Sequence, residues 1–173
     1  MLFANCVNPS FMHKSNDTNI AVILAGGIGQ RVGGDIPKQL RTLPDGRTVL
    51  QTCIDAFRQC EEIDRILVVM HPDWTDHVPE GVQVIEGGHE RWESSWHAAQ
   101  ALAQQYPHPE QVNVLLHDCA RPFVSRDLIR RVCVALQHHQ AVSVAVPVTD
   151  TIYSVQQDGV IGAIPHRKLL MRA

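Results

Sequence analysis

The chain has 173 residues, of which 45% are hydrophobic and 19% charged, with a formal net charge of −3. This length suits one domain with a sizeable core, and the charge argues against a general nucleic-acid or membrane binder, which needs a basic face. No apolar stretch approaches the length of a membrane span. The five cysteines are scattered and form no C-x-x-C pair, which indicates reduced thiols in a cytoplasmic protein.

The first half of the chain alternates apolar runs with helical spacing. Residues 1–19 lack the features of a signal peptide, so we expect a disordered N-terminal extension there and a folded domain over 20–173. The run "NIAVILAGG" (19–27) is typical of a buried parallel strand that enters a glycine loop. Helical spacing then predicts a helix over 48–63, and strands follow at 65–71 and 82–88.

The second half continues this alternation and then weakens. A long helix is predicted over 90–105, with Trp92, Trp96, Ala99 and Ala103 near one stripe. The run "VNVLLHD" (112–118) is a predicted strand that ends on an acid. Ser125 is the expected N-cap of a helix that runs to about residue 139, and a strand follows at 141–148. The remainder suggests a strand, a turn at Asp158 and Gly159, and an extended arm.

Alternating strands and helices predict an α/β fold, with three layers around a mostly parallel sheet. Ligands of such sheets bind beyond the carboxyl ends of the strands. Polar clusters follow three of the predicted strands there, at 26–39, 86–94 and 117–122. We therefore expect these clusters to converge on one edge of the sheet.

The glycine-rich stretch "AGGIGQRVGGDIPKQ" (25–39) favours phosphate binding. Glycines let backbone N–H groups approach phosphate oxygens closely, and Arg31 and Lys38 add positive charge. The plain alternative is a flexible surface loop. It is not a G-x-x-x-x-G-K-[ST] loop, because Gln39 follows Lys38. A Rossmann dehydrogenase is also disfavoured, since no acid ends the second predicted strand.

Three motifs in order resemble a known family. They are A-G-G-x-G-x-R-x-G followed by P-K-Q, then "GGHERWES" (87–94) and "LHDCARPFVS" (116–125). They look like those of the 2-C-methyl-D-erythritol 4-phosphate and ribitol-5-phosphate cytidylyltransferases. The resemblance implies a Rossmann-like nucleotidyltransferase fold and an enzyme that transfers CMP from CTP to a polyol phosphate, releasing pyrophosphate.

The resemblance also implies roles for particular residues. Catalytic roles fall to Arg31, Lys38 and Asp118, with Asp118 as a ligand of Mg²⁺. Residues implied to bind the nucleotide are Ala25, Gly26, Gly27, Gly29, Gly88, His89, Arg91 and Ser94. Arg121, Thr151 and Arg167 are implied to bind the acceptor, and the arm over 150–170 to form a homodimer. The histidines and cysteines do not form a compact zinc ligand set.

The acceptor remains open between two polyol phosphates. "HDCARP" favours methylerythritol phosphate, which we place first, whereas "MHPDW" (70–74) and "IPHR" (164–167) lean toward ribitol phosphate. His89 stands where the family often has Asp, and Cys119 stands where it tends to have a small residue. The sequence stops at Ala173, before the family's Q-T-P-Q segment, so we expect either a truncated chain or a naturally short relative. A module that binds CTP without catalysis is a further alternative.

Overall fold

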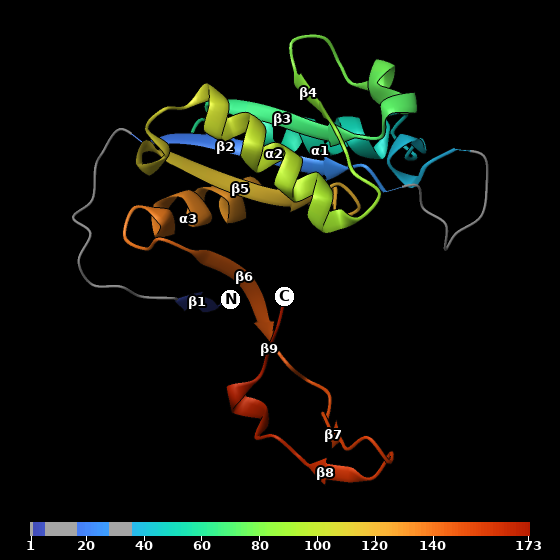
Figure 1. Ribbon diagram of the computed structural model, residues 1–173, viewed down its shortest axis with the longest axis vertical. Coiled ribbons are helices and arrows are strands. Elements are labelled where there is room, and N and C mark those ends of the chain that lie inside the picture. Colours follow the sequence, from blue (N-terminus) through green and yellow to red (C-terminus); the bar gives the residue numbers. More distant parts are fainter. Residues whose placement is uncertain (1, 6–16, 28–35) are drawn as a thin grey trace. The chain divides into compact units, whose positions relative to one another are not determined.

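The structure is a computed structural model that describes residues 2–5, 17–27 and 36–173 (Figure 1). The chain divides into two compact units. The larger unit comprises residues 14–133, and the smaller unit comprises residues 1–13 and 134–173.

The larger unit is built on a four-stranded parallel sheet in the order β4-β3-β2-β5. Its strands are β2 (Thr18–Ala25), β3 (Arg65–Met70), β4 (Gln83–Glu86) and β5 (Val112–Asp118). Ala25 pairs with Met70, Met70 with Glu86, and Leu24 with Asp118. The strands therefore end level with one another, as the positions of the polar clusters predict.

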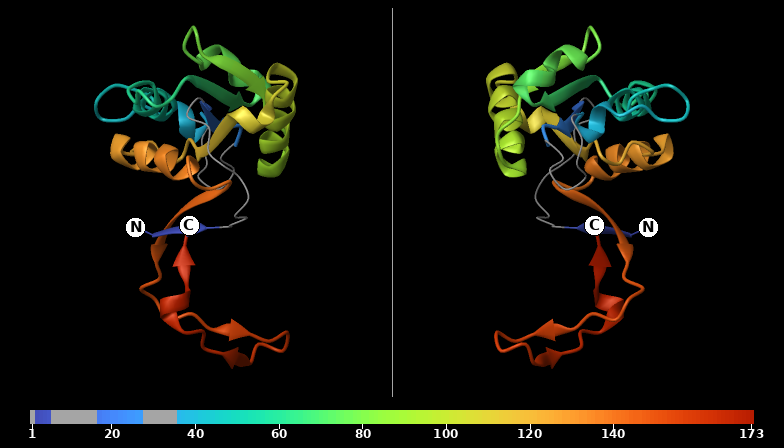
Figure 2. Two further views of the ribbon diagram at one scale, coloured as in Figure 1. Left: turned by 90° about the vertical axis from the view of Figure 1, so that its left-hand side faces the viewer. Right: turned by 90° about the vertical axis from the view of Figure 1, so that its right-hand side faces the viewer.

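Helices cover both faces of this sheet. Helix α2 (Arg91–Gln105) lies on one face, with α1 (Val49–Arg58) and the part of α3 (Arg126–Leu136) up to Cys133 on the other (Figure 2). Because β2 is central and covered on both faces, its residues from Ile20 to Ala25 are all buried. The predicted three-layer α/β fold is confirmed.

Helix α1 is shorter than the predicted span of 48–63. It begins with a capping box in which Gln51 N–H donates to Thr48 Oγ1 and Thr48 N–H donates to Gln51 Oε1, both at 3.0 Å. It ends at Arg58. Beyond it, Ile63 N–H donates to Cys60 O and Asp64 N–H to Asn19 O, which turns the chain into β3.

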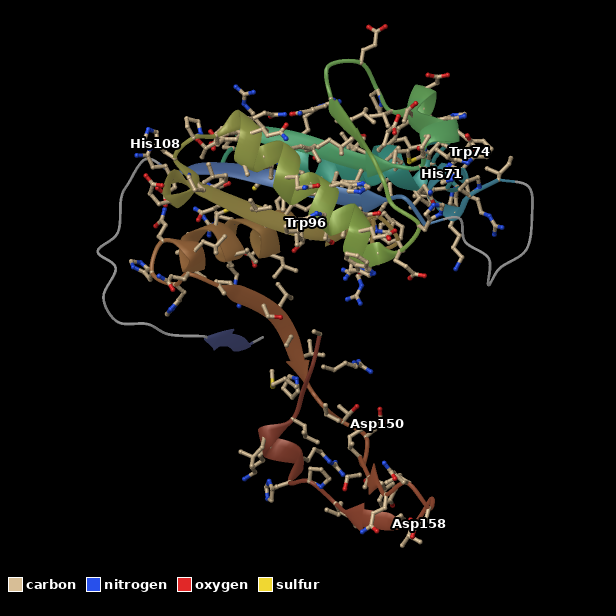
Figure 3. The ribbon with its side chains drawn as sticks, in the orientation of Figure 1. His71, Trp74, Trp96, His108, Asp150 and Asp158 are labelled. Atoms are coloured by element: carbon tan, nitrogen blue, oxygen red, sulfur yellow. The ribbon has the colours of Figure 1, made fainter. Side chains whose placement is uncertain are left out.

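Helix α2 has the predicted length, and the stripe that it buries is not the one on which the tryptophans lie. Its buried residues are Ser94, Ala98 and Leu102, which lie on the stripe that packs against β2 and β3. Trp92 and Trp96 are instead 67% and 58% exposed, and Figure 3 shows Trp96 on this helix. Small residues allow a helix to approach a sheet closely, so the tryptophan stripe predicted from spacing is not the core-facing one.

Short 3₁₀ turns connect the larger elements. They are η1 (Lys38–Leu40), η2 (Pro72–His77), η3 (Pro109–Gln111) and η4 (Arg167–Leu169). Of these, η1 has the most direct bearing on the glycine loop, because it contains the P-K-Q lysine and glutamine.

The smaller unit has a sheet in the order β1-β6-β9. It contains β1 (Leu2–Asn5), β6 (Val142–Pro147) and β9 (Met171–Arg172), paired antiparallel. Strand β1 lies inside the segment 1–19, for which the sequence predicts no regular structure. Its partner β6 is distant in sequence, and such long-range pairing leaves no local signal in four residues.

A hairpin forms the arm of the smaller unit. Strands β7 (Ser154–Val155) and β8 (Ile161–Ala163) pair antiparallel. Gly159 has a φ of +84°, and Asp158 Oδ1 accepts from Val160 N–H at 3.0 Å. Figure 3 labels Asp158 at this turn. The predicted turn at Asp158 and Gly159 is confirmed.

Candidate active site

Two glycine segments meet at the carboxyl edge of the sheet in the larger unit. Gly26 follows β2, and Gly87 follows β4. A Cβ on Gly26 would lie 3.2 Å from Ser94 Oγ and 3.7 Å from Gly87 Cα, and one on Gly87 would lie 3.1 Å from Ser94 Oγ. These positions admit side chains poorly, so glycine lets the two segments approach each other.

Ser94 lies between these glycine segments. It is only 4% exposed, and its Oγ accepts a hydrogen bond from Gly88 N–H at 3.2 Å. A hydroxyl both accepts and donates, so Ser94 retains its own proton for a second partner. Ser94 is therefore a buried residue of this edge and not an exposed residue of the helix surface.

Helix α2 also holds the end of β4. His97 Nδ1 lies 2.9 Å from Glu86 O, and because a carbonyl only accepts, this nitrogen carries the proton. Gly87 N–H donates to Met70 O at 2.8 Å. The peptide unit between Glu86 and Gly87 is therefore bonded on both sides, which fixes the direction in which the chain leaves β4.

An ion pair joins the first residue of α2 to the last residue of β5. Arg91 Nε lies 3.0 Å from Asp118 Oδ1, and the Asp118 side chain is 34% exposed. The two polar clusters at 86–94 and 117–122 are therefore brought together, as expected for strand ends of a parallel sheet.

Asp118 begins a tight turn that contains Arg121. Arg121 N–H donates to Asp118 O, and His117 Nε2 lies 3.0 Å from Arg121 O. The His117 ring packs edge-on against Phe57, with ring centroids 5.1 Å apart. Burial lowers the pKa of His117, which favours the neutral ring in this turn.

The Cys119 side chain is buried below this turn, with 2% exposure. The pKa of the neighbouring Cys53 thiol is far above its ordinary value. The main cause is a hydrogen bond with Cys119, and burial is the second cause. Thiolate is the nucleophilic form of cysteine. Cys119 is thus a buried residue at the position where the resembling family tends to have a small one.

Turn η1 places two neighbouring residues on opposite sides. Lys38 is exposed, whereas Gln39 is 6% exposed. Gln39 Nε2 donates to Ala25 O at 2.5 Å and to Gly27 O at 3.1 Å. The sequence alone predicts no role for Gln39, although its place in the P-K-Q motif is a visible signal.

The remaining predicted residues divide into three groups. Gly29 and Arg31 lie outside the described residues. His89 is exposed beside Gly88. Thr151 and Arg167 belong to the smaller unit, where Arg167 Nη2 donates to Thr151 Oγ1 at 3.4 Å. Thr151 and Arg167, the two residues of the arm that are implied to bind the acceptor, are therefore in contact with each other.

The donor set at this edge suits a hard cation held partly by phosphate. Among residues 2–5, 17–27 and 36–173, no group of three or more His, Cys, Asp or Glu side chains is placed to hold a metal ion. Mg²⁺ is usually bound by one or two carboxylates together with substrate phosphates. A single partly exposed carboxylate at Asp118 fits this mode of binding.

Glycine segments, a carboxylate and cations at the carboxyl edge of a parallel sheet are typical of nucleotide-binding α/β domains. The sequence profile of the IspD family, 2-C-methyl-D-erythritol 4-phosphate cytidylyltransferase, matches residues 19–173. The chain belongs to this family of cytidylyltransferases.

Known proteins agree with this assignment. The 2-C-methyl-D-erythritol 4-phosphate cytidylyltransferase of Symbiobacterium thermophilum is 36% identical over 154 residues, covering 86% of this chain and 63% of the relative. The bifunctional ribulose 5-phosphate reductase/CDP-ribitol pyrophosphorylase Bcs1 of Haemophilus influenzae is 33% identical over 153 residues, covering 83% of this chain and 31% of that protein.

A solved structure shares the fold. The 4-diphosphocytidyl-2C-methyl-D-erythritol synthase of Anaerococcus prevotii superposes with a TM-score of 0.75 at 27% identity, covering 91% of this chain and 68% of that one. The present chain spans 63% of the length of the Symbiobacterium relative, which is less than two thirds. In the part of the chain that the structure describes, no helix is long and apolar enough to cross a membrane.

Proposed function

We propose that this chain transfers CMP from CTP to 2-C-methyl-D-erythritol 4-phosphate. An oxygen of the acceptor phosphate attacks the α-phosphorus of CTP in line, and the bond to the β-phosphate breaks to release pyrophosphate. The observation that carries the proposal is the meeting of Gly26, Gly87 and Ser94 beside the Arg91–Asp118 ion pair, in a member of this family. Such a site acts by positioning and charge neutralisation.

The triphosphate is proposed to lie on the segment after β2. Backbone groups of Ala25, Gly26, Gly27 and Gly29 approach its oxygens. Lys38 and Arg31 supply the positive charge, and the exposure of Lys38 supports this role. A charge that develops on phosphoryl oxygens is stabilised best by donors already fixed in place.

The cytosine is proposed to lie against the segment after β4. The residues that form this part of the site are Gly88, His89, Arg91 and Ser94. Ser94 is held by Gly88 N–H and retains a proton that can reach a base oxygen. The close approach of Gly26 and Gly87 around Ser94 favours a small pyrimidine over a purine.

Asp118 is proposed to hold Mg²⁺ together with the phosphates. The ion supplies neutralisation of phosphoryl charge when it is bound. The Asp118 carboxylate would then bind both Mg²⁺ and Arg91, because Arg91 already pairs with its Oδ1. Arg121, on the turn that starts at Asp118, is proposed to bind the acceptor phosphate.

The arm is proposed to bind the acceptor and to form a homodimer in the cytoplasm. Thr151 and Arg167 share a hydrogen bond there, so a phosphate can meet both. The arm exposes large apolar side chains, which support covering by a second copy. They are Ile152, Tyr153, Val155, Val160, Ile161, Ile164 and Leu169. The free thiols of Cys53, Cys60, Cys119 and Cys133 suit a reducing compartment.

Ribitol 5-phosphate is the second candidate acceptor. The likeness to the Haemophilus protein, whose name includes CDP-ribitol pyrophosphorylase, favours it. Both acceptors present a phosphate on a short polyol, so the phosphate-binding groups alone do not separate them.

The test is pyrophosphate release from CTP and Mg²⁺, with each polyol phosphate offered separately. We expect release with 2-C-methyl-D-erythritol 4-phosphate and none when Asp118→Asn replaces the carboxylate. Release with ribitol 5-phosphate alone would assign the second acceptor. CTP binding without release from either acceptor would indicate the non-catalytic module, and absence of CTP binding would overturn the proposal.

A further inference from the structure

Gln39 is a buried amide that bonds the backbone on which the triphosphate is proposed to lie. Its Nε2 group has two N–H donors, and they reach Ala25 O at 2.5 Å and Gly27 O at 3.1 Å. The side chain is 6% exposed, so water competes weakly for these bonds. One side chain therefore holds both ends of the dipeptide Gly26-Gly27.

These bonds set the direction of a backbone donor. A trans peptide unit is planar, and its C=O and N–H groups point in opposite directions. Because the Ala25 carbonyl points at the Gln39 amide, the N–H of Gly26 points away from Gln39. Glycine has no Cβ to restrict this rotation. The Gln39 amide supplies that restriction from outside the segment.

The same residue links the glycine segment to Lys38. Leu40 N–H donates to Pro37 O at 2.9 Å, which closes the turn η1 around both residues. Within this turn Lys38 is exposed while Gln39 is buried. The backbone of Lys38 is thus held at a fixed separation from Ala25 and Gly27.

We infer that Gln39 is a positioning residue, which fixes the orientation of the Gly26 amide and the separation of Lys38 from the glycine segment at the proposed triphosphate site. This inference rests on the proposed function, because it assigns the orientation of the nucleotide site. It also gives P-K-Q a physical meaning: proline opens the turn, lysine supplies charge, and glutamine ties the turn to β2.

The experiment compares the same chemical change at two glutamines. Gln39→Glu replaces the donating amide with an acceptor that faces two carbonyls. Gln51→Glu is the matched control, because Gln51 Oε1 accepts from Thr48 N–H and glutamate keeps that capping box. Gln39→Leu removes the donors without adding charge. Affinity for CTP with Mg²⁺ is measured by calorimetry, and folding by circular dichroism.

We expect Gln39→Glu to weaken CTP binding about 10- to 30-fold at pH 8, the effect of two lost hydrogen bonds, with Gln51→Glu unchanged. Lowering the pH to 6 should bring the CTP affinity of Gln39→Glu closer to that of the parent protein, because the protonated carboxyl of the new glutamate regains one O–H donor. Circular dichroism at both pH values identifies a merely structural loss, because that loss would lower the folded signal together with the affinity for CTP. Gln39→Leu should stay weak at both pH values.

The outcomes separate the inference from the proposed function. If the parent chain binds CTP and the Gln39 variants bind it equally well, the positioning role is wrong while the function stands. If Gln39→Glu is weak at both pH values, the carbonyl bonds are not the cause and the inference fails. If the parent chain does not bind CTP, the proposed function fails and the inference falls with it.

Discussion

Arg91 and Asp118 lie 27 residues apart in sequence, yet Arg91 Nε and Asp118 Oδ1 are 3.0 Å apart. The pair joins the start of α2 to the end of β5. It therefore connects the segment proposed to bind cytosine with the carboxylate proposed to bind Mg²⁺. Because both partners are partly exposed, the pair contributes modestly to stability. If Asp118 binds Mg²⁺ as proposed, Arg91 and the ion compete for one carboxylate.

Removing the arginine should strengthen metal binding at Asp118. In Arg91→Gln the carboxylate loses its cation, so we expect Mn²⁺, used as a spectroscopic substitute for Mg²⁺, to bind about two- to fivefold more tightly without nucleotide. Arg47→Gln is the control, since Arg47 pairs with Asp45 and Asp55 instead. Paramagnetic titration measures the affinity. Unchanged or weaker binding of Mn²⁺ to Arg91→Gln would show that Arg91 and the metal ion do not compete for Asp118.

Lys38 should affect transfer without affecting the fold. Its side chain is exposed on η1, so Lys38→Ala removes charge and little packing. We expect the rate of CMP transfer to fall about 10²- to 10³-fold, the scale seen when a fixed charge-stabilising donor is lost. Arg130→Ala, an exposed cation on α3, should leave the rate unchanged. A fully active Lys38→Ala protein would remove Lys38 from the proposed site.

The parallel sheet could be predicted because its strands are continuous apolar runs. Within the runs at 19–27 and 65–71, residues 20–25 and 67–70 are buried, and that apolar pattern is local in sequence. The convergence of 86–94 and 117–122 followed from strand polarity alone, and the Arg91–Asp118 contact bears it out.

The features that sequence could not predict depend on contacts between distant residues. In the sequence, Gln39 looks like any other polar residue. Its side chain reaches Ala25 O only because of the turn η1, and no spacing rule predicts that contact. Helix spacing placed Trp92 and Trp96 on one stripe. It did not decide which stripe would meet the sheet, and the smaller residues Ser94 and Ala98 pack there.

Gly88 should be more sensitive to alanine than Gly27. A Cβ on Gly88 would collide with Glu93 Cβ and approach Glu93 Oε2 at 2.7 Å. Glu93 closes the capping box of α2 by accepting from Glu90 N–H at 2.9 Å. Relieving the collision would disturb this cap, so we expect Gly88→Ala to lose about 1 kcal/mol of unfolding free energy.

The control for this prediction is Gly27→Ala. A Cβ on Gly27 meets no atom of the described residues within 4 Å, so the unfolding free energy of Gly27→Ala should stay within about 0.5 kcal/mol of the parent value. Urea unfolding followed by circular dichroism measures both variants. Equal stability of the two would mean that Glu93 moves aside without loss.

The buried thiol of Cys133 should make the fold sensitive to alkaline pH. Burial raises the pKa of Cys133 from about 9 to about 11. The unfolded chain therefore loses this proton at lower pH than the folded chain does. The stability contributed by the neutral thiol is full below pH 9 and is lost as the pH rises toward 11, by up to about 2 kcal/mol. Cys133→Ala should flatten that decline.

The measurement is the difference in unfolding free energy between the parent protein and Cys133→Ala, taken in reductant from pH 8 to 10.5. Lysines and tyrosines titrate in both proteins, so their contributions cancel in this difference. The side chain of Cys133 is 3% exposed, and the alanine variant starts lower because a buried sulfur is removed. Its deficit should then shrink as the pH rises. A constant deficit would mean that Cys133 ionises alike in the folded and unfolded chains.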